Sequence, residues 1–357
     1  MEDLLLLSRD IPIAKVIDNS LVVIDSSLLP LFLQRTGDVK RWLESRAIDG
    51  HRVNARLLKR ALRLQSKDDL ATVLAMNAAT ITDNYWVKSL NDDSTKYIDI
   101  RFTENMFGDL ALTGDANSFN QLPSKTPELT NIGSFEKCWR IEDGNWWIYK
   151  AGTNRELFSE LYAFEIGKSI GLSMARYEAA GKYIKTKDFT DNAKVNFEPA
   201  VSLIGDKSNY IEIYEILKEV DLNIANDYVK MCYFDGLIFN MDRHEYNFGI
   251  LRNCDTGEIL SLAPLFDHNV TMVSRGYPKN ILDDILVHDF TELLHYTNKP
   301  ISIGSISQSN FTRIAKEIPF QLPTEEGILN PCEFTADFLY QRQKFLKEQN
   351  KELLLIL

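Results

Sequence analysis

The spacing of apolar residues changes along the chain and predicts where strands and helices lie. Alternating apolar and polar residues predict a strand over residues 15–25. The segment 80–87 is rich in aromatic residues and predicts a loop or a short strand. Apolar residues three or four apart predict helices over 29–46, 53–64 and 68–76. Residues 1–105 show no candidate chemistry, and we interpret them as an N-terminal accessory α/β unit that packs against the rest or binds a partner.

A polar linker and a hairpin follow this unit. Residues 106–125 are rich in Gly, Asp, Asn and Ser, which is typical of a linker. Residues 137–141 and 146–150 then predict two strands, joined by the turn sequence E-D-G-N. Side chains two apart share a face of a strand, so Lys150 ends an apolar face that begins at Trp146. Because burying an unpaired ammonium group is costly, we expect Lys150 to have an anionic partner.

The helix expected after this hairpin carries a carboxylate that suits this role. Thr153 and Glu156 have the spacing of a capping box, which predicts a helix start, and Gly171 predicts its end. Glu160 lies on the flank of the apolar face, where it can reach the strand of Lys150. A Lys-bearing strand followed by a helix with a Glu is typical of the small lobe of a kinase-like fold. The alternative is that Glu160 is an ordinary surface residue.

The remaining elements predict a second lobe. Strand-like segments at 177–186 and 196–203 lead to Ile204-Gly205-Asp206, which we interpret as a hinge between lobes. Three helices are expected beyond it, at 210–221, 224–240 and 335–357. We therefore predict a kinase N-lobe over residues 126–205 and a mostly helical kinase C-lobe over residues 206–357.

Polar residues gather around a second predicted hairpin, whose strands are 248–251 and 259–262. Folding this hairpin brings Asn247, which precedes the first strand, close to Asp267, which follows the second strand, at the open end of the hairpin. Asp242 lies five residues before Asn247. A carboxylate on a loop, then an amide and a second carboxylate, is the layout of a phosphoryl-transfer site. Asp242 would accept or orient a hydroxyl, while Asn247 and Asp267 would hold magnesium. Plain solvation of the loops is the alternative.

Composition argues against several other classes of protein. The chain has 357 residues and a formal net charge of −11, which argues against a dedicated nucleic-acid binder. Its four cysteines stand far apart, which gives no zinc signature and suits a reducing compartment. The first ten residues do not have the pattern of a signal peptide, and the terminal L-L-L-I-L is too short to span a bilayer. We expect a cytoplasmic protein that does not bind a membrane.

Five segments, in this order, resemble the HipA-like serine/threonine kinases, bacterial kinases often found in toxin–antitoxin modules. They are T-P-E-L-T-N-I-G-S-F-E-K (126–137), W-I-Y-K (147–150), S-E-L-Y (159–162), D-R-H-E-Y-N-F-G (242–249) and L-A-P-L-F-D (262–267). The first segment has one glycine where a Gly-rich set would be stronger. The fourth is also similar to the catalytic loop of the related phosphatidylinositol 3- and 4-kinases, although F-D-H-N at 266–269 departs from their Asp-Phe-Gly.

The resemblance implies a role for each candidate in the catalytic and metal loops. Asp242 would be the catalytic base, with His244 beside it among the candidate catalytic residues. Asn247 and Asp267 would bind Mg²⁺.

The resemblance also implies how ATP is bound and how the enzyme is regulated. Lys150 would contact the α- and β-phosphates with Glu160 as its ion-pair partner, and Gly133 and Ser134 would lie in the phosphate-binding loop. In HipA-like kinases a hydroxyl residue of this loop is autophosphorylated, which switches the enzyme off. The matching regulatory phosphosite is Thr130, with Ser134 as a second hydroxyl.

We therefore predict an α+β protein with a two-lobed, protein-kinase-like (HipA-like) fold and an N-terminal accessory unit. It would transfer the γ-phosphate of Mg-ATP to a Ser or Thr hydroxyl of a protein that the sequence does not identify. The alternatives are a phosphatidylinositol-kinase-like lipid kinase and a nucleotide-binding pseudokinase that acts as a regulatory interaction module. No helix-turn-helix is evident in the sequence, so a role as a toxin bound at an operator would need a small helix-turn-helix antitoxin partner.

Overall fold

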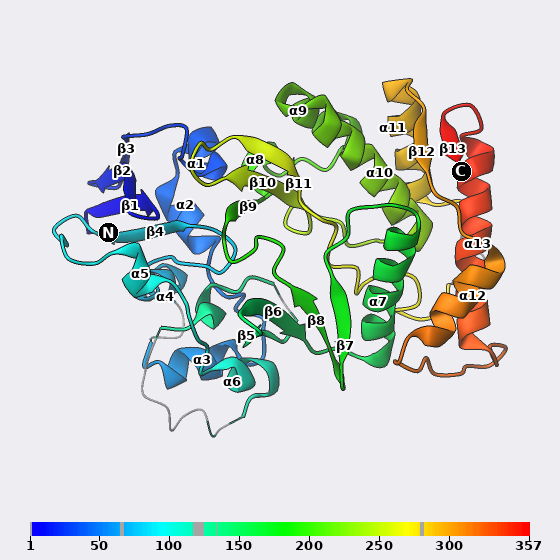
Figure 1. Ribbon diagram of the computed structural model, residues 1–357, viewed down its shortest axis with the longest axis horizontal. Coiled ribbons are helices and arrows are strands. Elements are labelled where there is room, and N and C mark those ends of the chain that lie inside the picture. The colour runs from blue at the N-terminus through cyan, green and yellow to red at the C-terminus, as the bar shows by residue number, and fades with distance from the viewer. Residues whose placement is uncertain (1, 65–67, 116, 118–124, 134, 279–281) are drawn as a thin grey trace. The chain divides into compact units, whose positions relative to one another are not determined.

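The computed structural model describes residues 2–64, 68–115, 117, 125–133, 135–278 and 282–357 (Figure 1). The chain forms two compact units and passes between them several times. The first unit comprises Met1–Ala151, Lys185–Glu198 and Ile250–Leu260, and the second comprises Gly152–Ile184, Pro199–Gly249 and Ser261–Leu357. The predicted domains 1–105, 126–205 and 206–357 and the predicted linker 106–125 are not tested by this division and stay predictions.

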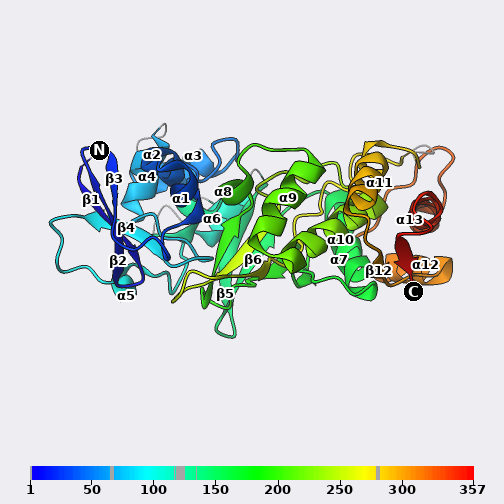
Figure 2. The same cartoon turned by 90° about the horizontal axis from the view of Figure 1, so that it is seen from above.

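The first unit begins with a sheet in the order β3-β2-β1-β4. Figure 2 shows its strands gathered near the N-terminus. Its strands are β1 (Leu4–Ser8), β2 (Ile11–Ile17), β3 (Ser20–Val23) and β4 (Tyr85–Ser89). The predicted strand 15–25 is the hairpin of β2 and β3, because Asp18 and Asn19 both have positive φ and form a tight turn between them. We did not predict β1, since a run of leucines shows no alternation. It pairs antiparallel with both β2 and β4.

Helices pack against this sheet. They are α1 (Leu31–Thr36), α2 (Val39–Glu44) and α4 (Asp69–Ala75), and Phe32, Trp42 and Val73 from them share one buried core with Leu6 of β1. The prediction of one helix over 29–46 is wrong. Gly37, with φ of +66°, ends α1, and the Asp38 side chain accepts from the backbone N–H of Arg41 to start α2. The unit also contains α3 (Ala55–Ala61), α5 (Tyr97–Ile100) and α6 (Gly108–Thr113).

Both predicted hairpins form. β5 (Lys137–Glu142) pairs antiparallel with β6 (Asn145–Lys150), and Asp143 and Gly144 turn the chain with positive φ. The second hairpin is β10 (Gly249–Asn253) and β11 (Ile259–Leu262), which joins β9 (Val195–Pro199) in a sheet of order β11-β10-β9. The first unit also holds the 3₁₀ turn η2 (Pro127–Thr130), and β8 (Tyr183–Lys187) runs from the second unit into the first.

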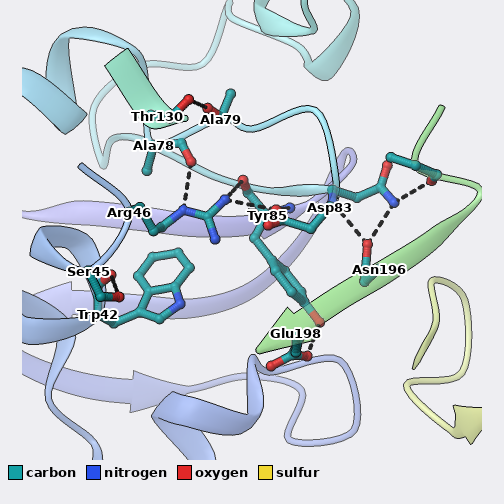
Figure 3. Close-up of polar contacts among 12 residues, drawn as sticks. Trp42, Ser45, Arg46, Ala78, Ala79, Asp83, Tyr85, Thr130, Asn196 and Glu198 are labelled. Atoms are coloured by element: carbon teal, nitrogen blue, oxygen red, sulfur yellow. Dashed lines mark hydrogen bonds and ion pairs between the residues drawn. The ribbon is translucent and has the colours of Figure 1, made fainter. Parts of the chain in front are cut away.

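A buried arginine anchors the second hairpin within the first unit. Arg252 of β10 donates to Glu198 Oε1 (2.5 Å) and to the Tyr85 hydroxyl (3.1 Å). Glu198 also accepts a hydrogen bond from that hydroxyl, at 2.9 Å (Figure 3). Arg252 also donates to the carbonyl oxygens of Ser27 and Leu29. The hairpin that follows Asn247 and precedes Asp267 is therefore held by the N-terminal part of the chain.

The second unit is mostly helical. Its helices are α7 (Asn154–Ser169), α8 (Val201–Ile204), α9 (Tyr210–Val220), α10 (Leu222–Ile238), α11 (Ile285–Thr297), α12 (Gln308–Glu317) and α13 (Pro331–Gln349). Its strands are β7 (Tyr177–Ala180), β12 (Ile301–Ile303) and β13 (Leu354–Ile356). Helix α10 contacts α9, α11 and α13, and the predicted apolar face of α10 is confirmed as buried: Tyr228, Val229, Cys232, Leu237 and Ile238.

Three predicted elements of the sequence are wrong in part. The segment 177–186 is not one strand, because Gly181, with φ of +65°, turns the chain between β7 and β8. The segment 196–203 is not one strand, because β9 ends at Pro199 and α8 begins at Val201. The terminal helix stops at Gln349, and the apolar end of the chain forms β13, parallel to β12. An unbroken apolar run does not continue the polar and apolar spacing of an amphipathic helix. Within the described ranges, no helix combines the length and apolarity that crossing a bilayer requires.

Candidate active site

In the second unit, the loop after α10 is shaped by an aspartate of that helix. Phe239 ends α10 in the left-handed conformation, with φ of +55°. The buried Asp235 then accepts from Asn240 Nδ2 at 2.7 Å, and the Asp235 carbonyl accepts from the Asn240 backbone N–H at 2.9 Å. The Asn240 Oδ1 atom in turn accepts from the backbone N–H of Asp242 at 3.2 Å. Asp242 is therefore held on a loop whose course is set by buried hydrogen bonds.

Arg243 connects the loop of Asp242 to the loop of Asp267. Its guanidinium donates to both carboxylate oxygens of Asp235, at 2.9 and 3.0 Å. Its Nη1 atom also donates to the carbonyl oxygens of Asn247 and Phe266, the latter at 2.9 Å. Burial opposes the charge of this side chain, but the adjacent Asp235 outweighs that and raises the pKa of Arg243 above its ordinary value. Sequence analysis missed this role, although Arg243 stands inside the D-R-H-E-Y-N segment.

Asn247 and His244 have defined orientations within the same loop. Asn247 Nδ2 donates to the Asp242 carbonyl at 2.9 Å, which leaves the Oδ1 atom as the one suited to bind a metal. The His244 Nδ1 atom accepts from the backbone N–H of Tyr246 at 3.2 Å, so the proton of the neutral imidazole lies on Nε2. The structure therefore brings Asp242, His244 and Asn247 together in one hydrogen-bonded loop.

The loop of Asp267 is also attached to α7. The backbone N–H of His268 donates to Glu160 Oε1 at 2.8 Å, and Glu160 is completely buried. The neighbouring Ser159 hydroxyl donates to the Thr271 carbonyl at 3.1 Å. Glu160 is therefore not the surface residue of the alternative interpretation. The capping box that starts this helix, Thr153 with Glu156, is confirmed.

In the first unit, two lysines lie opposite each other on the β5–β6 hairpin. Lys137 pairs with Lys150 across the strands, so both side chains are on one face. Both are largely buried. This face of the hairpin therefore carries two lysine side chains next to each other. Lys137 was not among the predicted site residues, although it is the last residue of the T-N-I-G-S-F-E-K segment.

Gly133 lies next to the Lys137 side chain. Its φ is +108°, which favours glycine, and a Cβ atom there would lie 2.3 Å from Lys137 Nζ. A side chain at position 133 would therefore displace the ammonium group. Ser134, the other predicted residue of this loop, lies outside the described residues.

A buried ion pair, Arg52 with Glu128, holds the segment that contains Gly133. Arg52 donates to the carbonyl oxygens of Asn131 (3.1 Å) and Lys137 (2.5 Å) and lies 4.0 Å from Glu128. Glu128 accepts from the backbone N–H of Trp139 and from the Asn131 amide. Burial raises the pKa of Glu128 and lowers that of Arg52, because loss of solvent disfavours the charged form of each group. Arg52 therefore binds the backbone on both sides of Gly133, at Asn131 and at Lys137.

The predicted phosphosite Thr130 is 5% exposed, and its hydroxyl donates to the Ala79 carbonyl at 2.7 Å (Figure 3). The adjacent Ala78 carbonyl accepts from Arg46, which also forms a 2.8 Å ion pair with Asp83. In this conformation, the Thr130 hydroxyl is engaged inside the N-terminal part of the unit. Phosphorylation would require Thr130 to leave this position.

The residue types predicted to bind magnesium suit that ion. Asp267 would supply carboxylate oxygens and Asn247 an amide oxygen, which are the hard ligands that Mg²⁺ prefers. Among the described residues, His, Cys, Asp and Glu side chains do not form a group of three or more that could hold a metal ion. The predicted ion pair of Lys150 with Glu160 would join the two units, and it stays a prediction. Cys138, Cys232, Cys254 and Cys332, all in described segments, carry free thiols.

Two solved structures are similar to this chain in fold. A chain of the HipA, HipB and operator DNA complex, from the toxin–antitoxin system of Shewanella oneidensis MR-1, aligns with a TM-score of 0.55 and 12% identity, and the alignment covers 97% of both chains. The proinflammatory kinase CtkA of Helicobacter pylori aligns with a TM-score of 0.44 and 18% identity over 61% of this chain and 90% of that chain. No protein-family model matches the sequence, and no curated protein is similar to it.

The likeness to the Shewanella chain extends over almost the whole of both chains, so it includes most of residues 1–105. The predicted α+β, HipA-like fold is confirmed. At this identity the likeness concerns the fold, and the roles of single residues depend on the contacts described above.

Proposed function

We propose that this chain is an ATP-dependent serine/threonine protein kinase of HipA type. The observation that carries the proposal is the position of Arg243, which binds the carbonyl oxygens of both Asn247 and Phe266 while anchored on Asp235. These contacts hold the loop of the proposed base beside the loop of the proposed metal ligand. Such pre-organisation is what phosphoryl transfer needs, because catalysis there is mostly positioning and charge stabilisation.

In the proposed reaction, a substrate hydroxyl oxygen forms a bond to the γ-phosphorus of ATP, and the bond from that phosphorus to the β-γ bridging oxygen breaks. Asp242 accepts the hydroxyl proton, and ADP leaves. Asn247 and Asp267 would hold Mg²⁺, which would neutralise negative charge on the phosphates. Lys150 and Lys137 lie on one face of the β5–β6 hairpin and would bind phosphate oxygens. Gly133 of the predicted phosphate-binding loop (residues 130–137) lies next to Lys137.

The proposal extends to partners. The similar Shewanella chain comes from a complex of HipA with HipB and operator DNA. We propose that this chain is the toxin of such a module and has a small helix-turn-helix antitoxin partner. With its formal net charge of −11, it would not bind DNA by itself. We place it in the cytoplasm.

A labelling experiment tests the class of substrate. Purified chain incubated with γ-labelled ATP, Mg²⁺ and a bacterial cytosolic extract should label protein bands, while phosphoinositide vesicles should stay unlabelled. The physical reason is the acidic net charge, which opposes docking on an anionic lipid surface. The control is the same incubation with EDTA. Labelled lipid with unlabelled protein would replace the protein-kinase assignment by the lipid-kinase alternative, and no labelling would favour the pseudokinase.

Regulation by phosphorylation of the predicted phosphate-binding loop, residues 130–137, is a separate part of the proposal. Mass spectrometry after incubation with Mg-ATP should find phosphate on Thr130 or Ser134, and ATP affinity should fall as it accumulates. A phosphate adds about 1.5 to 2 negative charges, which would repel the phosphates of ATP. It would also break the Thr130–Ala79 hydrogen bond and force Thr130 out of its buried position. Phosphorylation of other proteins while this loop stays unmodified would contradict self-inactivation by this route.

A further inference from the structure

The backbone at Asp267 has a conformation that needs support. Its φ is +61°, in the left-handed region that residues other than glycine rarely occupy. The direction of the Asp267 carboxylate depends on the two peptide groups that flank its Cα atom. Both of these peptide groups have side-chain partners within the second unit.

The peptide group between Phe266 and Asp267 is held at both ends. Its carbonyl accepts from Arg243 Nη1 at 2.9 Å, and its N–H donates to the Tyr177 hydroxyl oxygen at 3.1 Å. The next N–H, of His268, donates to Glu160 Oε1 at 2.8 Å. Because these contacts orient both flanking peptide planes, together they fix φ and ψ of Asp267.

Tyr177 is itself held in place. It lies on β7 and is 3% exposed, and its ring packs against Phe164 of α7 with the ring centroids 6.1 Å apart. Phe164 follows Glu160 by one turn of the same helix. Both acceptors that hold residues 267 and 268 therefore depend on the position of α7.

We propose that Tyr177 is a positioning residue of the metal site, whose hydroxyl holds the Asp267 backbone so that the carboxylate faces the magnesium ion. This inference rests on the proposed function. Tyr177 was absent from the sequence prediction, because it stands 90 residues before Asp267 on a different element. Removing its hydroxyl takes away the acceptor for one partly buried N–H while the ring keeps its packing. The effect should therefore fall on metal use, with the fold preserved.

The test is Tyr177→Phe, with Tyr183→Phe as the matched control. Tyr183 stands on the following strand, β8, and has no role in the proposed site. In Tyr177→Phe, the Mg²⁺ concentration that gives half-maximal phosphotransfer should rise about 3- to 10-fold, which corresponds to one hydrogen bond. The thermal unfolding midpoint should stay close to that of the control. A second readout needs no turnover: Mn²⁺ binding in the presence of a non-hydrolysable ATP analogue, followed by electron paramagnetic resonance, should weaken by the same factor.

The outcomes separate this inference from the proposed function. If Asp267→Asn abolishes phosphotransfer but Tyr177→Phe has the metal dependence of the wild type, the positioning role is wrong and the kinase assignment stands. If the wild type neither transfers phosphate nor binds Mn²⁺ with the nucleotide, both are wrong. If metal binding weakens equally in Tyr177→Phe and Tyr183→Phe, the effect is a general one of losing a hydroxyl and the proposal fails.

Discussion

Asp242→Asn should lower the rate of phosphotransfer about 10²- to 10⁴-fold, because it removes the proposed general base. Asp267→Asn should reduce activity by at least as much, since an amide replaces the proposed carboxylate ligand of Mg²⁺. The fold should persist in both variants, because asparagine keeps the size of aspartate and the contacts of both loops are made largely through the backbone. The measurements are initial rates with labelled ATP and the denaturant midpoint of each variant.

The matched control for these variants is Asp227→Asn. Asp227 is an exposed carboxylate on α10, and it pairs with Lys230 at 2.9 Å on the same helix. An exposed pair of this kind contributes little to stability, so this variant should be as active as the wild type. Unchanged turnover in Asp267→Asn would remove the magnesium assignment and most of the case for a kinase.

Arg243→Met should lose both stability and activity. It leaves the Asp235 carboxylate, which is 1% exposed, without its cationic partner, and breaking such a buried pair typically costs about 3–5 kcal/mol. Arg243→Met combined with Asp235→Asn should recover much of the free energy of unfolding, because the charge is removed and the amide oxygen can still accept from Asn240. The measurement is denaturant unfolding of the single and double variants.

Activity in the double variant should not recover. The carbonyl groups of Asn247 and Phe266 lose their shared donor in both variants, and a hydrogen bond to a charged group is worth about 1.5–3 kcal/mol. We expect the double variant to stay about 10- to 100-fold below the wild type at saturating Mg-ATP. Recovery of full activity together with stability would show that Arg243 is needed for folding alone. The contacts of Arg243 would then no longer support the proposed function.

The sequence predicted correctly those features that depend on contacts between residues close together in the chain. The capping box at Thr153 and the turn at Asp143-Gly144 depend on contacts within a few residues, so their residue types predict them directly. Failures occurred where a local signal was ambiguous. The leucines of β1 show no alternation, and apolar periodicity ran across Gly37 although that glycine ends α1. The terminal L-L-L-I-L pairs with β12, a strand more than fifty residues earlier in the chain.

The sequence by itself determined the candidate loops and their order, because the spacing from Asp242 to Asn247 and the hairpin before Asp267 are local patterns. Only the tertiary structure decided which side chains hold those loops. Arg243 reaches Phe266 across 23 residues, Arg52 reaches Lys137 across 85, and Tyr177 reaches Asp267 across 90. Each of these contacts satisfies a backbone group that loses much of its access to water only once distant elements pack together. No residue pattern within one element records such a contact, because the need for it arises from burial.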